Sequence, residues 1–231
     1  VIVSSRYVWW RYSETLNPNS YTSVIFTWLL IIAETYAFIV MLLGYFQVCW
    51  VLDRKPASLP KDKERWPSVD IFIPTYNEPL DVVKPTVYAA LTVDWPKEKL
   101  NVYILDEGSR KEFKDFACEV GAGYIEREEH KHAKAGNINH AMGITKGDFI
   151  AIFDCDHVPV KTFLQKTMGW FLKDEKIALV QTPHHFYSQD PFEKNLHLKE
   201  NVPNENSLFH DFIQKGNDTW NATMFCGSCA I

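Results

Sequence analysis

Two aspartates separated by one residue follow an apolar stretch, and their type and spacing suit metal binding. Asp154 and Asp156 come directly after the sequence FIAIF, which ends at Phe153. Two carboxylates this close can hold a hard divalent cation such as Mg²⁺ or Mn²⁺ through their oxygens. A nucleotide diphosphate would supply further ligands, and the cation would neutralise charge on a departing diphosphate. The alternative is a solvated loop, but the position after an apolar strand favours the metal site.

Polar residues also follow two other apolar stretches. Asp106 ends LNVYILD, and its carboxylate could accept hydrogen bonds from a uracil N–H or a ribose hydroxyl. Thr75, Tyr76, Asn77 and Glu78 follow VDIFIP and could grip a base, with Tyr76 stacking on it. Structural alternatives stay open for both groups. Asp106 could cap the next helix, and the second group could be an ordinary turn.

The segment HAKAGN, residues 132–137, combines a cation with the start of a helix. Lys134 is a compact cation that suits a phosphate, and the amide groups near Gly136 can bind the same anion. The alternative is a charged, solvated loop that continues the preceding run EREE.

Histidines and cysteines raise two other chemistries. Five histidines could ligate zinc: His130, His132, His157, His184 and His185. Their spacing matches neither H-E-x-x-H nor a Cys/His finger, so no zinc site is predicted. Cys226 and Cys229 form a C-x-x-C pair, but no second pair accompanies it, so no redox role is predicted.

Alternating strand and helix patterns must position these residues. Strands are expected at residues 69–74, 100–105, 123–126, 148–153 and 177–181. Helices are expected from Pro85 to about Leu91 and over residues 112–120, 135–144 and 162–171. Such βα units indicate an α/β fold with a mostly parallel sheet covered by helices on both faces. Ligands bind at the carboxyl ends of such strands, where the polar clusters stand.

The chain also carries one long apolar segment near its start. Residues 24–52 hold a single charge, Glu34, and exceed the roughly 20 apolar residues that span a bilayer. More Lys and Arg follow this segment than precede it, which places the rest of the chain in the cytoplasm. Glu34 could bond a neighbouring helix or line a polar path, and both alternatives stay open.

Composition limits the function classes. The chain has 231 residues, 46% of them hydrophobic, and a net charge of -5, which argues against a nucleic-acid partner. Its five cysteines are irregularly spaced, so a reducing compartment is expected rather than a disulfide framework.

Six motifs in order resemble the bacterial cellulose synthases of glycosyltransferase family 2: PTYNEP, LDEG, HAKAGN, FDCDHVP, QTPHHF and FCGS. The stretch RYVWWRYSETL before the apolar segment is similar as well. The resemblance implies a GT-A fold, preceded by a transmembrane α-helix. It further implies an inverting transfer of glucose from UDP-glucose to a growing β-1,4-glucan.

The resemblance also implies roles for individual residues. Mg²⁺, with Mn²⁺ as the alternative, would bind Asp154 and Asp156. Asp106, the chain's own candidate for the catalytic site, would recognise uridine together with Tyr76 and Glu78, and Lys134 would contact the diphosphate. The motif FCGS contributes Cys226, Gly227 and Ser228 beside the glucan acceptor. The family usually has Asp-Asp-Gly where this chain has Asp106-Glu107-Gly108.

The resemblance finally implies an organisation for the whole protein. A membrane segment is expected at residues 1–52 with its helix at about 22–52, a linker at 53–67, and a GT-A domain at 68–231 truncated at its C-terminal end. The expected location is a bacterial inner membrane, with the catalytic domain in the cytoplasm. The expected partners are membrane lipid and a periplasmic subunit. The family's general base belongs to a Thr-Glu-Asp motif that this chain lacks, so the fragment is expected to bind without turnover.

Three rival functions remain. A family 2 synthase could make another polysaccharide, such as curdlan or hyaluronan. A nucleotidyltransferase has a similar strand order, although the apolar segment argues against it. A non-catalytic membrane scaffold could bind a nucleotide without turning over any donor.

Overall fold

The computed structural model describes residues 1–16, 19–127, 131–185, 191–195 and 207–231. Contacts divide the chain into two compact units. One contains Val1–Asp53 and the described part of Phe186–Thr223, and the other contains Arg54–His185 and Met224–Ile231. This division differs from the expected one, in which residues 68–231 form a single domain.

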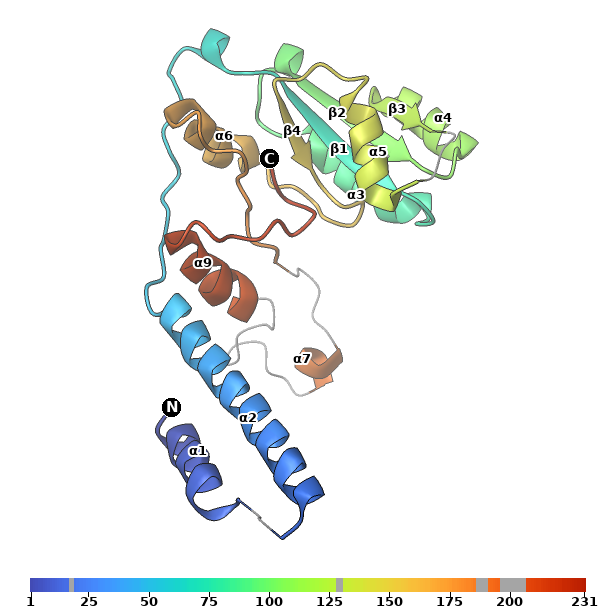
Figure 1. Ribbon diagram of the computed structural model, residues 1–231. Coiled ribbons are helices and arrows are strands. Elements are labelled where there is room, and N and C mark those ends of the chain that lie inside the picture. The colour runs from blue at the N-terminus through green and yellow to red at the C-terminus, as the bar shows by residue number, and fades with distance from the viewer. Residues whose placement is uncertain (17–18, 128–130, 186–190, 196–206) are drawn as a thin grey trace. The chain divides into compact units, whose positions relative to one another are not determined.

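The second unit is built on a four-stranded parallel sheet with strand order β3-β2-β1-β4 (Figure 1). The strands are β1 (Val69–Thr75), β2 (Leu100–Asp106), β3 (Gly123–Glu126) and β4 (Phe149–Ile152). All three strand pairs are parallel, with Val69 of β1 opposite Leu100 of β2 and Phe149 of β4. The parallel sheet is therefore confirmed, and the carboxyl ends of its strands share one edge.

Helices cover both faces of this sheet. They are α3 (Leu80–Leu91), α4 (Lys111–Val120), α5 (Ala133–Met142) and α6 (Phe163–Lys173). Ile71 and Ile73 of β1 pack in the larger apolar cluster, to which α3, α4 and α6 contribute. Phe72 points to the other face and joins a smaller cluster with Ala141 of α5. Every residue of β1 is buried, as expected for a central strand of a covered parallel sheet.

Two expected elements differ from the structure. Helix α3 begins at Leu80, and Pro85 lies inside it rather than in its first turn. The helix tolerates the lost backbone hydrogen bond because Val83 and Val87 are fully buried on the sheet.

Residues 177–181 were expected to form a strand, and this prediction is wrong. Gln181 forms an isolated antiparallel bridge with Ala230, and the flanking backbone hydrogen bonds join only Val180 to Ile231 and Thr182 to Cys229. The partner segment leaves the extended conformation at Cys229, whose φ of 52° is left-handed, so the pairing ends in that direction at the hydrogen bond from the Thr182 N–H to the Cys229 carbonyl oxygen.

The first unit contains the long apolar helix α2 (Tyr21–Val48), preceded by α1 (Ile2–Glu14). Among the described residues, α2 alone is long and apolar enough to cross a membrane by length and composition. It ends four residues before the predicted end at Leu52. Glu34 accepts hydrogen bonds from Arg11 Nε at 2.6 Å and Tyr7 Oη at 3.1 Å, both on α1. The structure thus shows the neighbouring-helix alternative for Glu34.

Short helices pack at the end of α2 within the same unit. Asn217 accepts a 2.5 Å hydrogen bond from Gln47, and the Trp220 ring lies against Phe46 and Trp50. The remaining short elements are η1 (Lys63–Arg65), η2 (Lys97–Lys99), α7 (Pro191–Asn195), the π-helical η3 (Leu208–Gln214) and α9 (Lys215–Thr219).

Candidate functional site

A cavity of about 620 Å³ opens at the carboxyl edge of the sheet. Six of the predicted site residues line it: Thr75, Tyr76, Glu78, Lys134, Asp154 and Asp156. They come from three separate βα turns, as the parallel sheet predicts. Gly227 and Ser228 adjoin the cavity through hydrogen bonds to Lys134 and Asp154, and Cys226 immediately precedes them. Asp106 is not among the lining residues.

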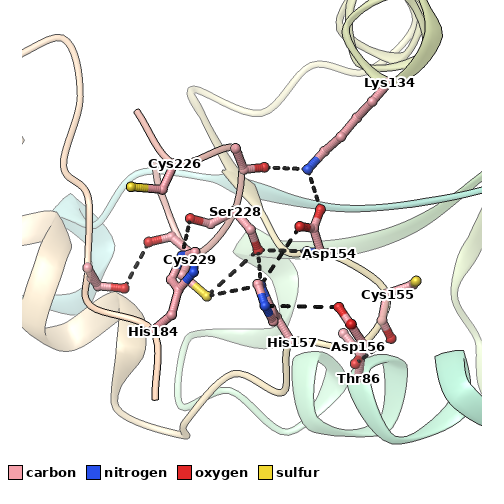
Figure 2. Close-up of polar contacts among 12 residues, drawn as sticks. Thr86, Lys134, Asp154, Cys155, Asp156, His157, His184, Cys226, Ser228 and Cys229 are labelled. Atoms are coloured by element: carbon pink, nitrogen blue, oxygen red, sulfur yellow. Dashed lines mark hydrogen bonds and ion pairs between the residues drawn. The ribbon is translucent and has the colours of Figure 1, made fainter. Parts of the chain in front are cut away.

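Lys134 connects two of the predicted motifs. Its Nζ donates to Asp154 Oδ1 and to the carbonyl oxygen of Gly227 (Figure 2). The lysine lies in the first turn of α5, which begins after His132 with φ of 65°. This ammonium therefore neutralises Asp154 from a position where a phosphate could also reach it.

A hydrogen-bonded chain fixes Asp154 from the other side. Its backbone N–H donates to Ser228 Oγ at 2.8 Å, and the same oxygen lies 2.6 Å from His157 Nδ1. His157 Nε2 lies 4.0 Å from Asp156 Oδ1, and its Nδ1 lies 3.9 Å from Asp154 Oδ2. The side chain of Asp156 is 67% exposed, so its oxygens are accessible to an incoming cation.

Glu78 is held as a carboxylate at the rim. It accepts hydrogen bonds from the Tyr76 backbone N–H at 2.7 Å and the Thr75 hydroxyl at 2.9 Å. Burial works to raise the pKa of Glu78, but the hydrogen bonds and the nearby Arg110 guanidinium outweigh it and lower the pKa. The Tyr76 side chain is exposed beside it, with a ring face available for stacking.

Asp106 lies beneath the cavity rather than in it. Its side chain is fully buried, and its oxygens accept from Arg110, from the backbone of Gly108 and from the Tyr124 hydroxyl. Arg110 Nη2 also donates to Thr75 Oγ1 at 3.0 Å. Asp106 therefore stabilises the loop after β2. A catalytic carboxylate would be expected to be exposed to the substrate, and Asp106 is not. Direct contact between Asp106 and a nucleotide stays a prediction that would require one of these donors to move.

Sequence reasoning missed a buried ion pair beside the site. Arg127 pairs with Glu107, which lines the cavity, and both side chains are at most 8% exposed. Arg127 also donates to the carbonyl oxygens of Lys131 at 2.8 Å and Ala133 at 3.0 Å. It therefore ties the end of β2 to the residues that precede Lys134. The charged run EREE indicated only a solvated surface, so no local signal identified Arg127.

The FCGS segment is held by another unpredicted residue, Gln181. Its Oε1 accepts from the Cys226 backbone N–H at 2.9 Å, and its Nε2 donates to the Ser228 carbonyl at 2.8 Å. Gly227 has a φ of 79°, which favours glycine, and this turn presents its carbonyl to Lys134. Gly227 and Ser228 of this motif thus contact Lys134 and Asp154, while Cys226 is held by Gln181.

Two thiols near the aspartates are held in their neutral form. Burial, followed by the charges of Glu78, Asp156 and Asp154, raises the pKa of Cys155 to about 12. Burial and the neighbouring carboxylates raise the pKa of Cys229 to about 11. Neither thiol is therefore expected to act as a nucleophile at neutral pH.

Comparison with known proteins identifies similar sequences. The model of the family described as "Glycosyl transferase family 2" matches residues 70–231. The cellulose synthase catalytic subunit [UDP-forming] of Xanthomonas axonopodis pv. citri (strain 306) is 56% identical over 99% of this chain. The subunit of the same name from Pseudomonas fluorescens (strain SBW25) is 52% identical over the whole chain. The chain spans 31% of the length of each of these relatives.

A solved structure shows the same fold. The mannosyltransferase PcManGT from Pyrobaculum calidifontis, in complex with GDP-Man and Mn²⁺, superposes with a TM-score of 0.52 at 24% identity. The match covers 67% of this chain and 46% of the mannosyltransferase. Together with the parallel sheet, it confirms the predicted GT-A fold.

Proposed function

Because the chain belongs to glycosyl transferase family 2, we propose that it is the donor-binding part of a processive, inverting glucosyltransferase. The proposed reaction moves glucose from UDP-glucose to a growing β-1,4-glucan, with synthesis coupled to export. The observation that carries the proposal is the cavity at the sheet edge, which gathers Lys134 and the two aspartates with a stacking ring. The similarity to two UDP-forming cellulose synthase subunits supports glucose and UDP over other donors.

The donor set at this edge fits a hard divalent cation, Mg²⁺ or Mn²⁺. Asp154 and Asp156 supply carboxylate oxygens, and Asp156 is open to solvent. The Mn²⁺ bound to the mannosyltransferase of similar fold supports a cation of this class. When bound, the cation would supply charge neutralisation for the departing diphosphate. Holding this cation is the role that we propose for the two aspartates.

The remaining residues bind and orient the donor. The ammonium of Lys134 is within reach of both Asp154 and the Gly227 carbonyl, so it can turn to a diphosphate without leaving the cavity. Tyr76 offers a ring for the uracil, and the ionised Glu78 offers acceptors for ribose hydroxyls. Cys226, Gly227 and Ser228 would face the approaching glucan acceptor. We assign no general base among the described residues.

We also propose the setting of the whole protein. The apolar helix α2 would cross a bacterial inner membrane in contact with its lipids, with the sheet-containing unit in the cytoplasm and a periplasmic partner subunit. A membrane-impermeant maleimide should then label Cys118, which is exposed on α4, in inside-out vesicles and not in right-side-out ones. The reverse pattern would contradict the orientation.

Donor competition tests the proposed substrate. The detergent-solubilised chain should bind UDP-glucose with a divalent cation, and GDP-mannose should compete at least about tenfold more weakly. UDP-N-acetylglucosamine binding more tightly than UDP-glucose would favour a hyaluronan-type synthase. Equal binding of every nucleotide sugar would favour a scaffold, and a longer form of the protein that makes no polymer from UDP-glucose would contradict the activity.

A further inference from the structure

Two imidazoles and one thiol meet beside the aspartates, although they are far apart in the sequence. They are His157 after β4, His184, and Cys229 near the end of the chain (Figure 2). One ligand atom from each lies within 4.8 Å of the others. The rings of His157 and His184 have centroids 4.7 Å apart, and all three residues are half-buried. Sequence spacing predicted no such group, because the fold alone brings these segments together.

The separation of the ligand atoms suits a tetrahedral metal ion. Cys229 Sγ lies 3.8 Å from His157 Nδ1. With metal–nitrogen bonds of about 2.1 Å and metal–sulfur bonds of about 2.3 Å, a tetrahedral ion requires this edge to be about 3.6 Å. Asp154 Oδ2 lies 3.9 Å from the same His157 nitrogen, and Asp154 groups with Asp156 and His157 rather than with His184 and Cys229. It is therefore the nearest candidate for a fourth ligand, and its side chain must shift toward the other two residues to complete the tetrahedron.

The backbone holds the thiol in place. Cys229 has a φ of 52°, a left-handed conformation that is costly for a residue with a side chain. Its carbonyl oxygen accepts from the Thr182 backbone N–H at 3.0 Å and the Thr182 hydroxyl at 2.8 Å. These bonds fix the turn that directs Cys229 toward His157. Thr182, which makes both bonds, lies two residues before His184.

We propose that His157, His184 and Cys229 form a binding site for Zn²⁺, with Asp154 as the fourth ligand. Imidazole and thiolate are the ligands that borderline-soft ions prefer, whereas the carboxylates of Asp154 and Asp156 suit Mg²⁺ or Mn²⁺. On binding, the Cys229 thiol loses its proton to solvent and forms the sulfur–metal bond. His157 Nδ1 gives up its 2.6 Å hydrogen bond with Ser228 Oγ in exchange for the ion.

Asp154 would be a ligand of both the proposed Zn²⁺ site and the donor-site cation, so the two ions should compete for it. An ion held there withdraws Asp154 from the cation of the donor site, so Zn²⁺ should weaken UDP binding. This consequence rests on the proposed function, whereas the binding of Zn²⁺ does not. The two are therefore measured separately, the first by UDP titration and the second by metal titration alone.

Co²⁺, followed by displacement with Zn²⁺, is the direct probe. The detergent-solubilised chain should show thiolate-to-Co²⁺ charge-transfer absorption, which Zn²⁺ abolishes. Cys229→Ser should remove this absorption, and His184→Gln should weaken Zn²⁺ binding by about tenfold or more. The matched controls Cys118→Ser and His185→Gln change exposed residues outside the group and should leave both signals unchanged.

Three results would overturn the site. They are the absence of a thiolate band in the unmodified chain, its persistence in Cys229→Ser, and its equal loss in Cys118→Ser. Circular dichroism establishes whether each variant is folded. If Cys229→Ser does not fold, the effect of His184→Gln on Zn²⁺ binding decides whether the site exists.

Discussion

At the scale of single residues, Glu78 and Arg127 do the positioning that the motifs alone do not reveal. Glu78 closes the turn after β1 by accepting bonds from Thr75 and Tyr76. Arg127 holds the residues at the start of α5 by donating to the carbonyl oxygens of Lys131 and Ala133. Each makes its contribution as a charged group, so each can be tested by removing the charge with little change in shape.

Glu78→Gln should destabilise the chain at neutral pH and not in acid. The hydrogen bonds lower the pKa of Glu78 below its ordinary value of 4.5. Below pH 4.5 the unfolded chain therefore takes up a proton that the folded chain still excludes. The stabilisation is complete above pH 4.5 and is lost as the pH falls through the folded pKa. Urea unfolding at a series of pH values measures it.

Glu175→Gln is the control for this prediction, because Glu175 is exposed in the turn after α6. Its variant should follow the unmodified chain at every pH. A Glu78→Gln deficit that persists unchanged at acid pH would show that the charge of Glu78 is not what stabilises the turn.

Arg127→Met should cost about 3–5 kcal/mol, because it leaves the buried carboxylate of Glu107 without its partner. The double variant Arg127→Met/Glu107→Gln should recover part of this loss, since no unpaired charge then remains. A double-mutant cycle from chemical unfolding measures the coupling. Simple additivity of the two single changes would argue against the pair as a unit.

The residue scale also shows what sequence can predict about a site. Asp154, Asp156 and the Thr75–Glu78 turn were identifiable because polar groups at the ends of apolar strands must face the ligand edge. Arg127 and Gln181 were not identifiable. Their partners are mostly backbone carbonyls and amides, and no residue pattern records those.

At the scale of elements, the four strands of the parallel sheet were predicted to within one or two residues. Their apolar runs stop at Pro74, Asp106 and Asp154, and such stops are visible in the sequence. The start of α3 was missed because Pro85 resembles a first-turn proline, whereas burial of Val83 extends the helix before it. Residues 177–181 were wrongly predicted to be a strand, because within this stretch only Val180 and Gln181 pair with another segment, and their partners Ile231 and Ala230 lie far along the chain.

Gly169→Ala should separate α6 from the segment that precedes the sheet. A Cβ at Gly169 would lie 2.1 Å from the Ala57 carbonyl oxygen, so the backbone must shift. We expect a loss of about 1–3 kcal/mol, as for other overpacked positions. Gly143→Ala is the matched control, because the atom nearest to its new Cβ, the His140 carbonyl oxygen, would be 3.4 Å away. Equal thermal unfolding of the two variants would contradict the close packing.

At the scale of the whole molecule, the chain joins two kinds of structure. One unit carries an apolar helix of 28 residues, and the other carries a parallel sheet with a ligand edge. The apolar helix and the sheet could be predicted as distinct parts from the sequence, because an apolar run with one charge is unlike the alternating βα pattern that follows. It did not predict that residues 207–223 belong with the apolar helix, since that grouping depends on contacts such as Gln47 with Asn217.

Calorimetric titration of the detergent-solubilised chain with UDP, with and without Mg²⁺, tests the central claim most directly. We expect binding that depends on the cation and that weakens at least about tenfold in Asp156→Ala, because this exposed carboxylate would lose its share of the ion. Asp174→Ala, at the far end of α6, is the control and should bind normally. UDP binding that is indifferent to Mg²⁺ and to Asp156, or a folded chain that does not bind UDP, would contradict the account.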